Sequence, residues 1–109
     1  MKIFHLATDE AWTSALAAGT YTVSTLGLEL AEVGFIHCSQ AEQVAGVYEG
    51  FYRDVAAPLL LLSIDTDLLT SPWQLDAVEG QPLPFPHIYG PLNVDAVVSA
   101  EPFRSSAST

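Results

Sequence analysis

The chain has 109 residues and carries 13 Asp and Glu against three Lys and Arg, a net charge of −10, which fits one acidic globular domain. Three scattered basic residues cannot form the positive surface to which nucleic acids or anionic membranes bind, so we expect neither as a partner. Half of the residues are apolar and 15% are charged, which argues against disorder and predicts a packed core.

The sequence has the cysteine content and the lack of targeting segments that are typical of a cytoplasmic protein. The single cysteine, Cys38, allows no disulfide within the chain, which suits a reducing compartment. The first residues lack the apolar stretch of a signal peptide, and the longest apolar run, residues 56–64, is far shorter than the roughly 20 residues of a membrane span. We therefore expect a cytoplasmic location, one domain over residues 1–104 and a flexible tail over residues 105–109.

The first third of the chain predicts short strands around one helix. Residues 3–6 favour a strand, and residues 8–19 favour a helix because a threonine N-cap begins the segment and a glycine ends it. Extended chain is expected at residues 21–23 and a short helix or an irregular turn at residues 25–33. Residues 35–37 predict a second buried strand.

A second helix is predicted after that strand. Ser39 and Glu42 match the capping-box pattern S-x-x-E, so the helix should begin at Ser39 and continue to about Arg53. Four of its side chains are expected to face inward, namely Val44, Val47, Tyr48 and Phe51.

The last part of the chain predicts three further strands. Residues 58–64 are apolar at nearly every position, which is typical of a central strand covered on both faces. Residues 73–78 and 96–103 favour strands. Residues 80–91 contain four prolines and predict an ordered loop, except around residues 87–89. About five strands and two main helices make an α+β domain.

Three histidines are the side chains of this sequence that normally titrate near neutral pH. His5 lies in the first strand, His37 ends the second, and His87 ends the proline-rich segment. Strand ends and ordered loops are where functional sites are usually built, so we expect the three to converge on one pocket as catalytic candidates. The alternative is three separate structural histidines whose ring nitrogens bind nearby carbonyl groups.

Two further features suggest ligand contacts. The N-terminus of the helix predicted at Ser39 would favour an anion, so a phosphate or diphosphate could bind there without any Lys or Arg. Tyr89, followed by Gly90, could stack on a base or on a ring linked to ribose. In the alternative, Ser39 only caps the helix and Tyr89 is a core residue.

Two other chemistries are disfavoured. Cys38 adjoins His37 on a strand, so the two side chains point to opposite faces, and a cysteine nucleophile at the pocket is not expected. Three histidines could hold zinc, but their spacings of 32 and 50 residues include no closely spaced ligand pair. We expect no metal, and a metal centre of three histidines stays as an alternative.

Three segments in order carry a family resemblance: FHLAT (residues 4–8), GFIHCS (residues 34–39) and FPHIYGPL (residues 85–92). They resemble the domain-of-unknown-function family 952, and the similarity extends from about residue 3 to residue 103. That family comprises small bacterial proteins that are grouped by fold with the ADP-ribosyltransferase-like superfamily. The resemblance implies a small split-sheet domain with a cleft that binds NAD.

By this resemblance, the cleft would be lined by His5, His37, Ser39, His87 and Tyr89, with Phe35 and Gly90 as further ligand-binding residues. NAD or an ADP-ribose-type nucleotide would be the substrate, for ADP-ribosyl transfer or hydrolysis. No motif assigns a catalytic glutamate. A non-catalytic domain that binds a small ligand is the alternative function, and a metal-binding domain with three histidines is another.

Overall fold

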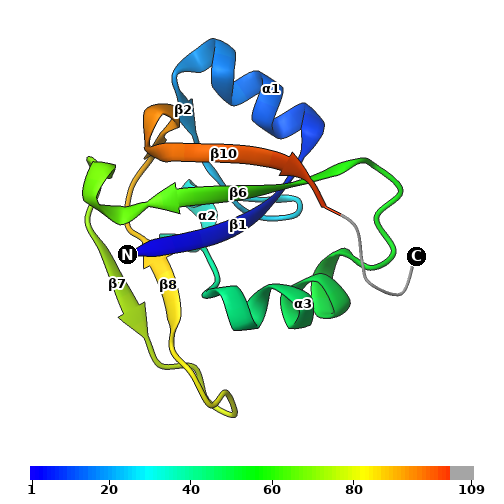
Figure 1. The fold of residues 1–109 in the computed structure, drawn as a ribbon, viewed down its shortest axis with the longest axis vertical. Helices are drawn as coiled ribbons and strands as arrows, with labels where there is room; N and C mark the ends of the chain where they lie inside the picture. The colour runs from blue at the N-terminus through cyan, green and yellow to red at the C-terminus, as the bar shows by residue number, and fades with distance from the viewer. Residues whose placement is uncertain (104–109) are drawn as a thin grey trace.

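The computed structural model describes residues 1–103 and has an antiparallel three-stranded sheet at its centre (Figure 1). The strands are β1 (Lys2–Thr8), β6 (Leu59–Asp65) and β10 (Val97–Pro102), in the order β1-β6-β10. The apolar strand β6 is therefore central, as predicted. The predicted tail at residues 105–109 lies outside the described residues.

The first helix, α1 (Asp9–Ala18), has the ends that the sequence predicts. The Thr8 hydroxyl accepts a hydrogen bond from the Ala11 N–H at 3.1 Å, which caps the first turn. Gly19 ends the helix at a φ of 88°, in the left-handed region that favours glycine. Trp12 is buried in the larger core cluster and attaches α1 to the rest of the domain.

A second antiparallel sheet consists of β5 (Ile36–His37), β8 (Phe85–Ile88) and β7 (Trp73–Asp76), in the order β5-β8-β7. The four prolines around β8 predicted a loop, but β8 is the buried middle strand of this sheet. Pro86 fits there because its carbonyl still accepts a hydrogen bond from the Cys38 N–H at 2.9 Å. A proline removes one donor from the ladder and leaves its acceptor in place.

Ser39 connects the two sheets and does not cap a helix. It forms an isolated bridge with Phe4 of β1, with N–H to carbonyl distances of 2.9 and 2.7 Å. The helical segment begins one residue later, where the Gln40 N–H donates to Gln43 Oε1 at 2.8 Å in a capping box. The predicted cap at Ser39 is wrong, and the predicted diphosphate site loses its structural basis.

The second helical segment is irregular. It consists of a 3-10 turn, η1 (Ala41–Gln43), one α-helical turn, α3 (Val44–Val47), and a π-helical turn, η2 (Tyr48–Tyr52). The wider π-helical turn changes which side chains face inward. Tyr52 is buried, whereas Phe51 is 61% exposed, so the prediction that Phe51 faces inward is wrong. The other three predicted inward residues, Val44, Val47 and Tyr48, are buried or half-buried.

Two short strand pairs complete the domain. β2 (Thr20–Tyr21) pairs with β9 (Leu92–Asn93), and β3 (Val23–Thr25) forms a hairpin with β4 (Leu28–Glu29). The remaining elements are α2 (Leu30–Val33), η3 (Thr66–Leu68) and η4 (Val94–Ala96). The predicted short helix or turn at residues 25–33 is thus the end of a hairpin followed by one helical turn.

The architecture is a mixed α+β domain, as predicted. A smaller core cluster, which includes Leu6 of β1 and Val47 of α3, packs the irregular helical segment against the central sheet. None of the helices within residues 1–103 has both the length and the apolar character that a membrane crossing requires.

Candidate functional site

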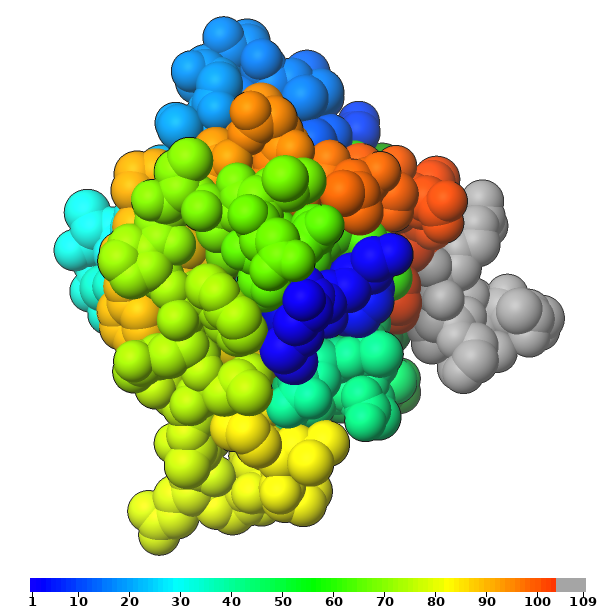
Figure 2. Space-filling model, turned by 60° about the vertical axis from the view of Figure 1, so that its left-hand side comes forward, coloured from blue at the N-terminus to red at the C-terminus, as the bar shows by residue number. Residues whose placement is uncertain are grey.

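A cavity of about 620 Å³ lies between the β3–β4 hairpin, the second helical segment and the loop that joins β7 to β8, residues 77–84. In Figure 2 this loop projects from the lower end of the molecule. The polar lining residues are Ser24, Thr25, His37, Glu42, Gln43 and Gln81. The rest of the lining is apolar and includes three phenylalanines, Phe35, Phe51 and Phe85.

Two of the seven predicted site residues, His37 and Phe35, line this cavity. The lining does not include the other five, which are His5, Ser39, His87, Tyr89 and Gly90. The three histidines are nevertheless close together, because His5 and His87 each contact His37 directly. They form one connected group in which only His37 faces the cavity.

His5 is a core residue with both ring nitrogens occupied. Its side chain is 2% exposed, its Nδ1 lies 2.7 Å from the His37 carbonyl oxygen, and its Nε2 lies 2.9 Å from the Tyr21 hydroxyl. The carbonyl can only accept, so Nδ1 carries the proton and the Tyr21 hydroxyl donates to Nε2. Burial lowers the pKa of His5 to about 4, so the ring is neutral at pH 7.

The same contacts argue against a metal centre formed by the three histidines. A metal ion would need a lone pair from each ring, and the Nε2 lone pair of His5 already accepts from Tyr21. Within residues 1–103, no group of three His, Cys, Asp or Glu side chains is arranged to hold a metal ion.

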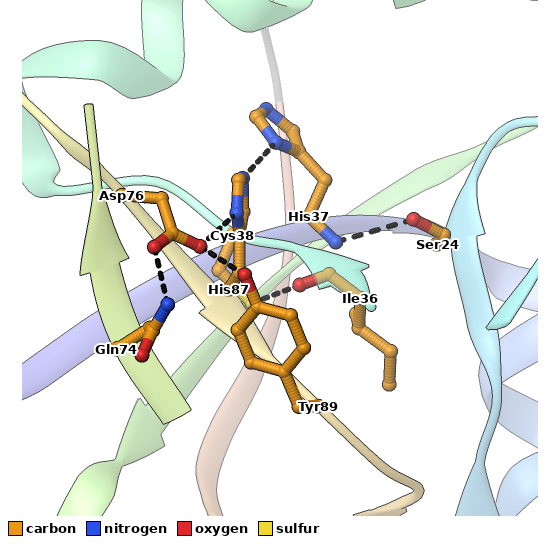
Figure 3. A network of polar contacts seen from close by, with 8 residues as sticks. All are labelled: Ser24, Ile36, His37, Cys38, Gln74, Asp76, His87 and Tyr89. Carbon is orange, nitrogen blue, oxygen red and sulfur yellow. Dashed lines mark hydrogen bonds and ion pairs between the residues drawn. The ribbon is translucent and has the colours of Figure 1, made fainter. Parts of the chain in front are cut away.

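His37 and His87 are brought together by strand register. They are directly paired between β5 and β8, which places both side chains on one face of the second sheet. His37 Nδ1 lies 3.3 Å from His87 Nε2 (Figure 3). The other nitrogen of His87, Nδ1, lies 2.7 Å from Asp76 Oδ2 on the neighbouring strand β7. The three side chains thus form a continuous chain of polar contacts.

The Asp76 carboxylate anchors this chain at its outer end. The Tyr89 hydroxyl donates to Oδ2, and the Gln74 amide donates to Oδ1 at 2.6 Å (Figure 3). The hydrogen bond from Tyr89 lowers the pKa of Asp76, with further lowering from His87 and Gln74. Tyr89, a predicted ligand-binding residue, therefore holds Asp76 and does not line the cavity.

The roles of Asp76 and Gln74 were not predicted from the sequence. The alternation within residues 73–78 did place both on one face of a strand. The missing information was the partner strand, because the prolines concealed β8. With β8 recognised, the register pairs Gln74 with His87 and Asp76 with Phe85, and Asp76 comes within reach of the histidine.

Aromatic contacts fix the two imidazole rings. The Phe35 ring stacks on His87 with a centroid distance of 3.9 Å and an interplanar angle of 18°. Phe85 packs against His37 at a centroid distance of 4.9 Å. Burial, and secondarily the nearby His87, lower the pKa of His37 to about 4, so this ring is also neutral at pH 7.

The remaining nitrogen of His37 is Nε2. It has no hydrogen-bond partner among residues 1–103, where every fully buried side-chain nitrogen and oxygen atom does have one. An unpaired Nε2 is therefore a solvent-accessible atom, and His37 is part of the cavity lining. In Figure 3 this part of the ring points away from Ser24, so the Ser24 hydroxyl is not aligned as a nucleophile.

Comparison with known proteins identifies the family. A family model described as "Protein of unknown function (DUF952)" matches residues 6–100. The chain belongs to the DUF952 family. This confirms the resemblance drawn from the three sequence motifs. The chain matches none of the curated proteins.

The DUF952 domain is similar to solved structures of CC0527 from Caulobacter crescentus. One crystal structure has a TM-score of 0.82 and 28% identity, covering 95% of this chain and 87% of that chain. The solution NMR structure has a TM-score of 0.76 and 28% identity, covering 98% and 88%. The crystal structure of a double mutant has a TM-score of 0.81 and 27% identity, covering 95% and 87%.

Two other motif residues of this DUF952 domain, Cys38 and Gly90, are closely packed. Cys38 is fully buried, burial raises the pKa of its thiol, and its Sγ lies 3.8 Å from the Ile36 carbonyl oxygen. The prediction that Cys38 faces the core is confirmed. Gly90 packs so closely on Ser71 that an added Cβ would lie 2.5 Å from the Ser71 hydroxyl oxygen.

Two glutamines fasten the β7–β8 loop over the cavity. Gln40 Nε2 donates to the Pro84 carbonyl at 2.9 Å. Gln43 Nε2 donates to the carbonyls of Leu83 and Pro84 at 3.1 and 3.0 Å. Both glutamines lie at the start of the second helical segment, so the capping box and the cavity wall depend on the same side chains.

Proposed function

We propose that this DUF952 domain binds a small ligand in the cavity and that His37 Nε2 exchanges a proton with it as a general base. One observation carries the proposal: the polar chain Asp76–His87–His37 ends at an unpaired, solvent-accessible ring nitrogen of a residue that lines the cavity. General base catalysis requires such a nitrogen within hydrogen-bond reach of a bound substrate.

The proposal assigns one protonation state to each of Asp76, His87 and His37. Asp76 is ionised at neutral pH and can only accept, so His87 Nδ1 carries a proton and donates to it. In this proposal His87 is neutral, so its Nε2 lone pair accepts the Nδ1 proton of His37. His37 Nε2 is left with a lone pair directed into the cavity. The Asp76 charge would stabilise the proton that His37 takes up, by way of His87.

NAD and ADP-ribose-type nucleotides are candidate ligands, and an ADP-ribosyltransferase-like fold, with transfer or hydrolysis at the ribose carbon, is part of this proposal. The flat rings of Phe35 and Phe85 beside the histidines suit an aromatic ring of the ligand, and His37 suits a ribose hydroxyl. The diphosphate would lie outside the cavity, because the lining that residues 1–103 provide contains neither Lys nor Arg. Fold similarity alone does not fix this activity.

The test is histidine NMR during titration with NAD and with ADP-ribose, followed by a search for turnover. A ligand that binds as proposed shifts the ring signals of His37 most, those of His87 less, and those of His5 least. Turnover should be lost in a folded His37→Ala variant and retained in Glu101→Gln, which changes an exposed residue of β10 outside the cavity. Binding without turnover would favour a non-catalytic binding domain. Millimolar ligand that shifts no histidine would exclude both nucleotides.

A further inference from the structure

The cavity mouth is lined by exposed apolar side chains. Phe51, Leu28, Val78 and Leu83 all line the cavity, and all four are among the exposed large hydrophobic residues of the domain. Apolar side chains gathered at the rim of a concave site are typical of a ligand-binding surface. A ligand with an apolar body would cover them, and a small polar ligand would leave them in water.

The charge of the cavity has one sign. Among residues 1–103, Glu42 is the only carboxylate in the lining, and no Lys or Arg lines the cavity. Of the basic residues within residues 1–103, Lys2 lies on β1 and Arg53 pairs with Glu49, so neither neutralises the cavity. The chain as a whole has a net charge of −10. A ligand therefore approaches a negative potential, which repels anions and attracts cations.

The aromatic lining favours the same sign of charge. Phe35, Phe51 and Phe85 are lining residues, and the face of a phenyl ring attracts a cation. His37 is neutral at pH 7, and its Nε2 lone pair can accept a hydrogen bond from an ammonium group. The cavity thus combines an apolar rim, a carboxylate, aromatic rings and one acceptor nitrogen.

We propose that the cavity binds hydrophobic monocations, such as arylalkylamines, in preference to anions of the same size. This rests on the cavity and the His37 acceptor of the proposed function, but it names a cationic ligand class that competes with the diphosphate-containing nucleotides NAD and ADP-ribose. The charged head would lie near Glu42 and His37, and the apolar body would contact the rim.

Three probes with one skeleton test the proposal: 4-phenylbutylamine, 4-phenylbutanol and 4-phenylbutyrate, titrated at pH 7 and low salt. We expect the amine to bind most tightly, the alcohol next and the carboxylate weakest. The amine and the carboxylate should differ by about tenfold, as expected for one carboxylate at a partly solvated site. Carboxylate binding as tight as amine binding, or no binding of any probe, would overturn the proposal.

Glu42→Gln identifies the source of the preference. Glu42 makes no side-chain hydrogen bond within residues 1–103, so the variant should fold normally. It should bring the amine close to the alcohol in affinity. The matched control, Glu101→Gln, makes the same charge change at an exposed residue of β10 outside the cavity and should preserve the order. An equal effect of both variants would overturn the assignment to Glu42.

The two proposals can fail separately. If the probes bind in the expected order but the His37 ring signals do not respond, the proton-exchange role of His37 is wrong and the ligand class stands. If His37 responds most to the carboxylate, the ligand class is wrong and the role of His37 stands.

Discussion

His5 and His37 differ in where their ring nitrogens point, although burial lowers the pKa of both to about 4. Both nitrogens of His5 are bonded inside the core, to Tyr21 and to the His37 carbonyl. One nitrogen of His37 contacts His87, and the other faces the cavity. A lowered pKa therefore does not separate a structural histidine from a functional one. The number of hydrogen-bond partners of each ring nitrogen does separate the two.

The two histidines are also connected. His5 Nδ1 donates to the main-chain carbonyl of His37, and the His37 N–H donates to the Ser24 hydroxyl at 3.3 Å. These bonds hold the backbone of a two-residue strand, which has few ladder bonds of its own. His5 therefore positions the backbone of His37. Substitutions at each residue can separate the structural role of His5 from the role of His37 at the cavity.

The largest expected effect is a loss of stability on substitution of His5, the structural histidine. His5→Ala should lower the free energy of unfolding by about 4 kcal/mol, because it creates a core cavity and leaves Tyr21 and the His37 carbonyl without partners. Tyr21→Phe removes only one hydroxyl partner and should cost about 1 to 2 kcal/mol. Urea denaturation measures both. A loss below about 1 kcal/mol for His5→Ala would show that His5 is not a core residue.

Acid should destabilise the domain through the same residue. The pKa of His5 is about 4 in the folded state and 6.5 in the unfolded state, so between these values the unfolded chain binds the extra proton. The contribution is complete above pH 6.5 and is lost as the pH falls toward 4, by about 3 kcal/mol for His5. Urea midpoints across this range should fall in the wild type and fall less in His5→Gln, where only the similar contribution of His37 remains. If the urea midpoint fell with pH as steeply in His5→Gln as in the wild type, the assignment of this effect to His5 would be contradicted.

A smaller stability effect is expected on the functional side. His37→Ala should lower the free energy of unfolding by only about 1 kcal/mol, because the ring is half-buried at a cavity wall. The same variant should abolish ligand-induced shifts in the His87 ring. Thermal denaturation and NMR titration measure the two effects. A stability loss equal to that of His5→Ala would remove the contrast between the two histidines.

The smallest effect should come from the loop over the cavity. Gln43→Ala removes two hydrogen bonds to the carbonyls of Leu83 and Pro84 and the capping bond that Gln43 Oε1 accepts from the Gln40 N–H, and should cost about 1 kcal/mol or less globally. Amide hydrogen exchange within residues 77–84 should become about tenfold faster. Gln81→Ala, in the loop itself, is the control and should leave exchange near the wild-type rate. Equal exchange in both variants would show that Gln43 does not fasten the loop.

Local signals in the sequence predicted the regular elements well. The apolar run of β6 and the cap and stop of α1 each depend on neighbouring residues, and both are confirmed. The errors occurred where long-range pairing overrides a local pattern. Ser39 matches a capping box but is used in a bridge with Phe4. Phe51 fits an α-helical period that the π-helical turn η2 interrupts.

The candidate site could be predicted only in part. Three histidines, in a strand, at a strand end and at the end of the proline-rich segment, indicated one group, and His5 and His87 both contact His37. Which of them faces the cavity depends on strand register, and register depends on recognising β8 despite its proline. Asp76 could not be assigned without that strand, because it reaches His87 across the sheet and not along the chain.

The most direct test of the central claim is the protonation of each histidine ring nitrogen at pH 7, measured by long-range ¹H–¹⁵N NMR. The proton-exchange role predicts that His87 and His37 both carry their proton on Nδ1, with an unprotonated Nε2 on each. Asp76→Asn should weaken this preference at His87. A neutral His37 with its proton on Nε2 would contradict the account, because no lone pair would then face the cavity.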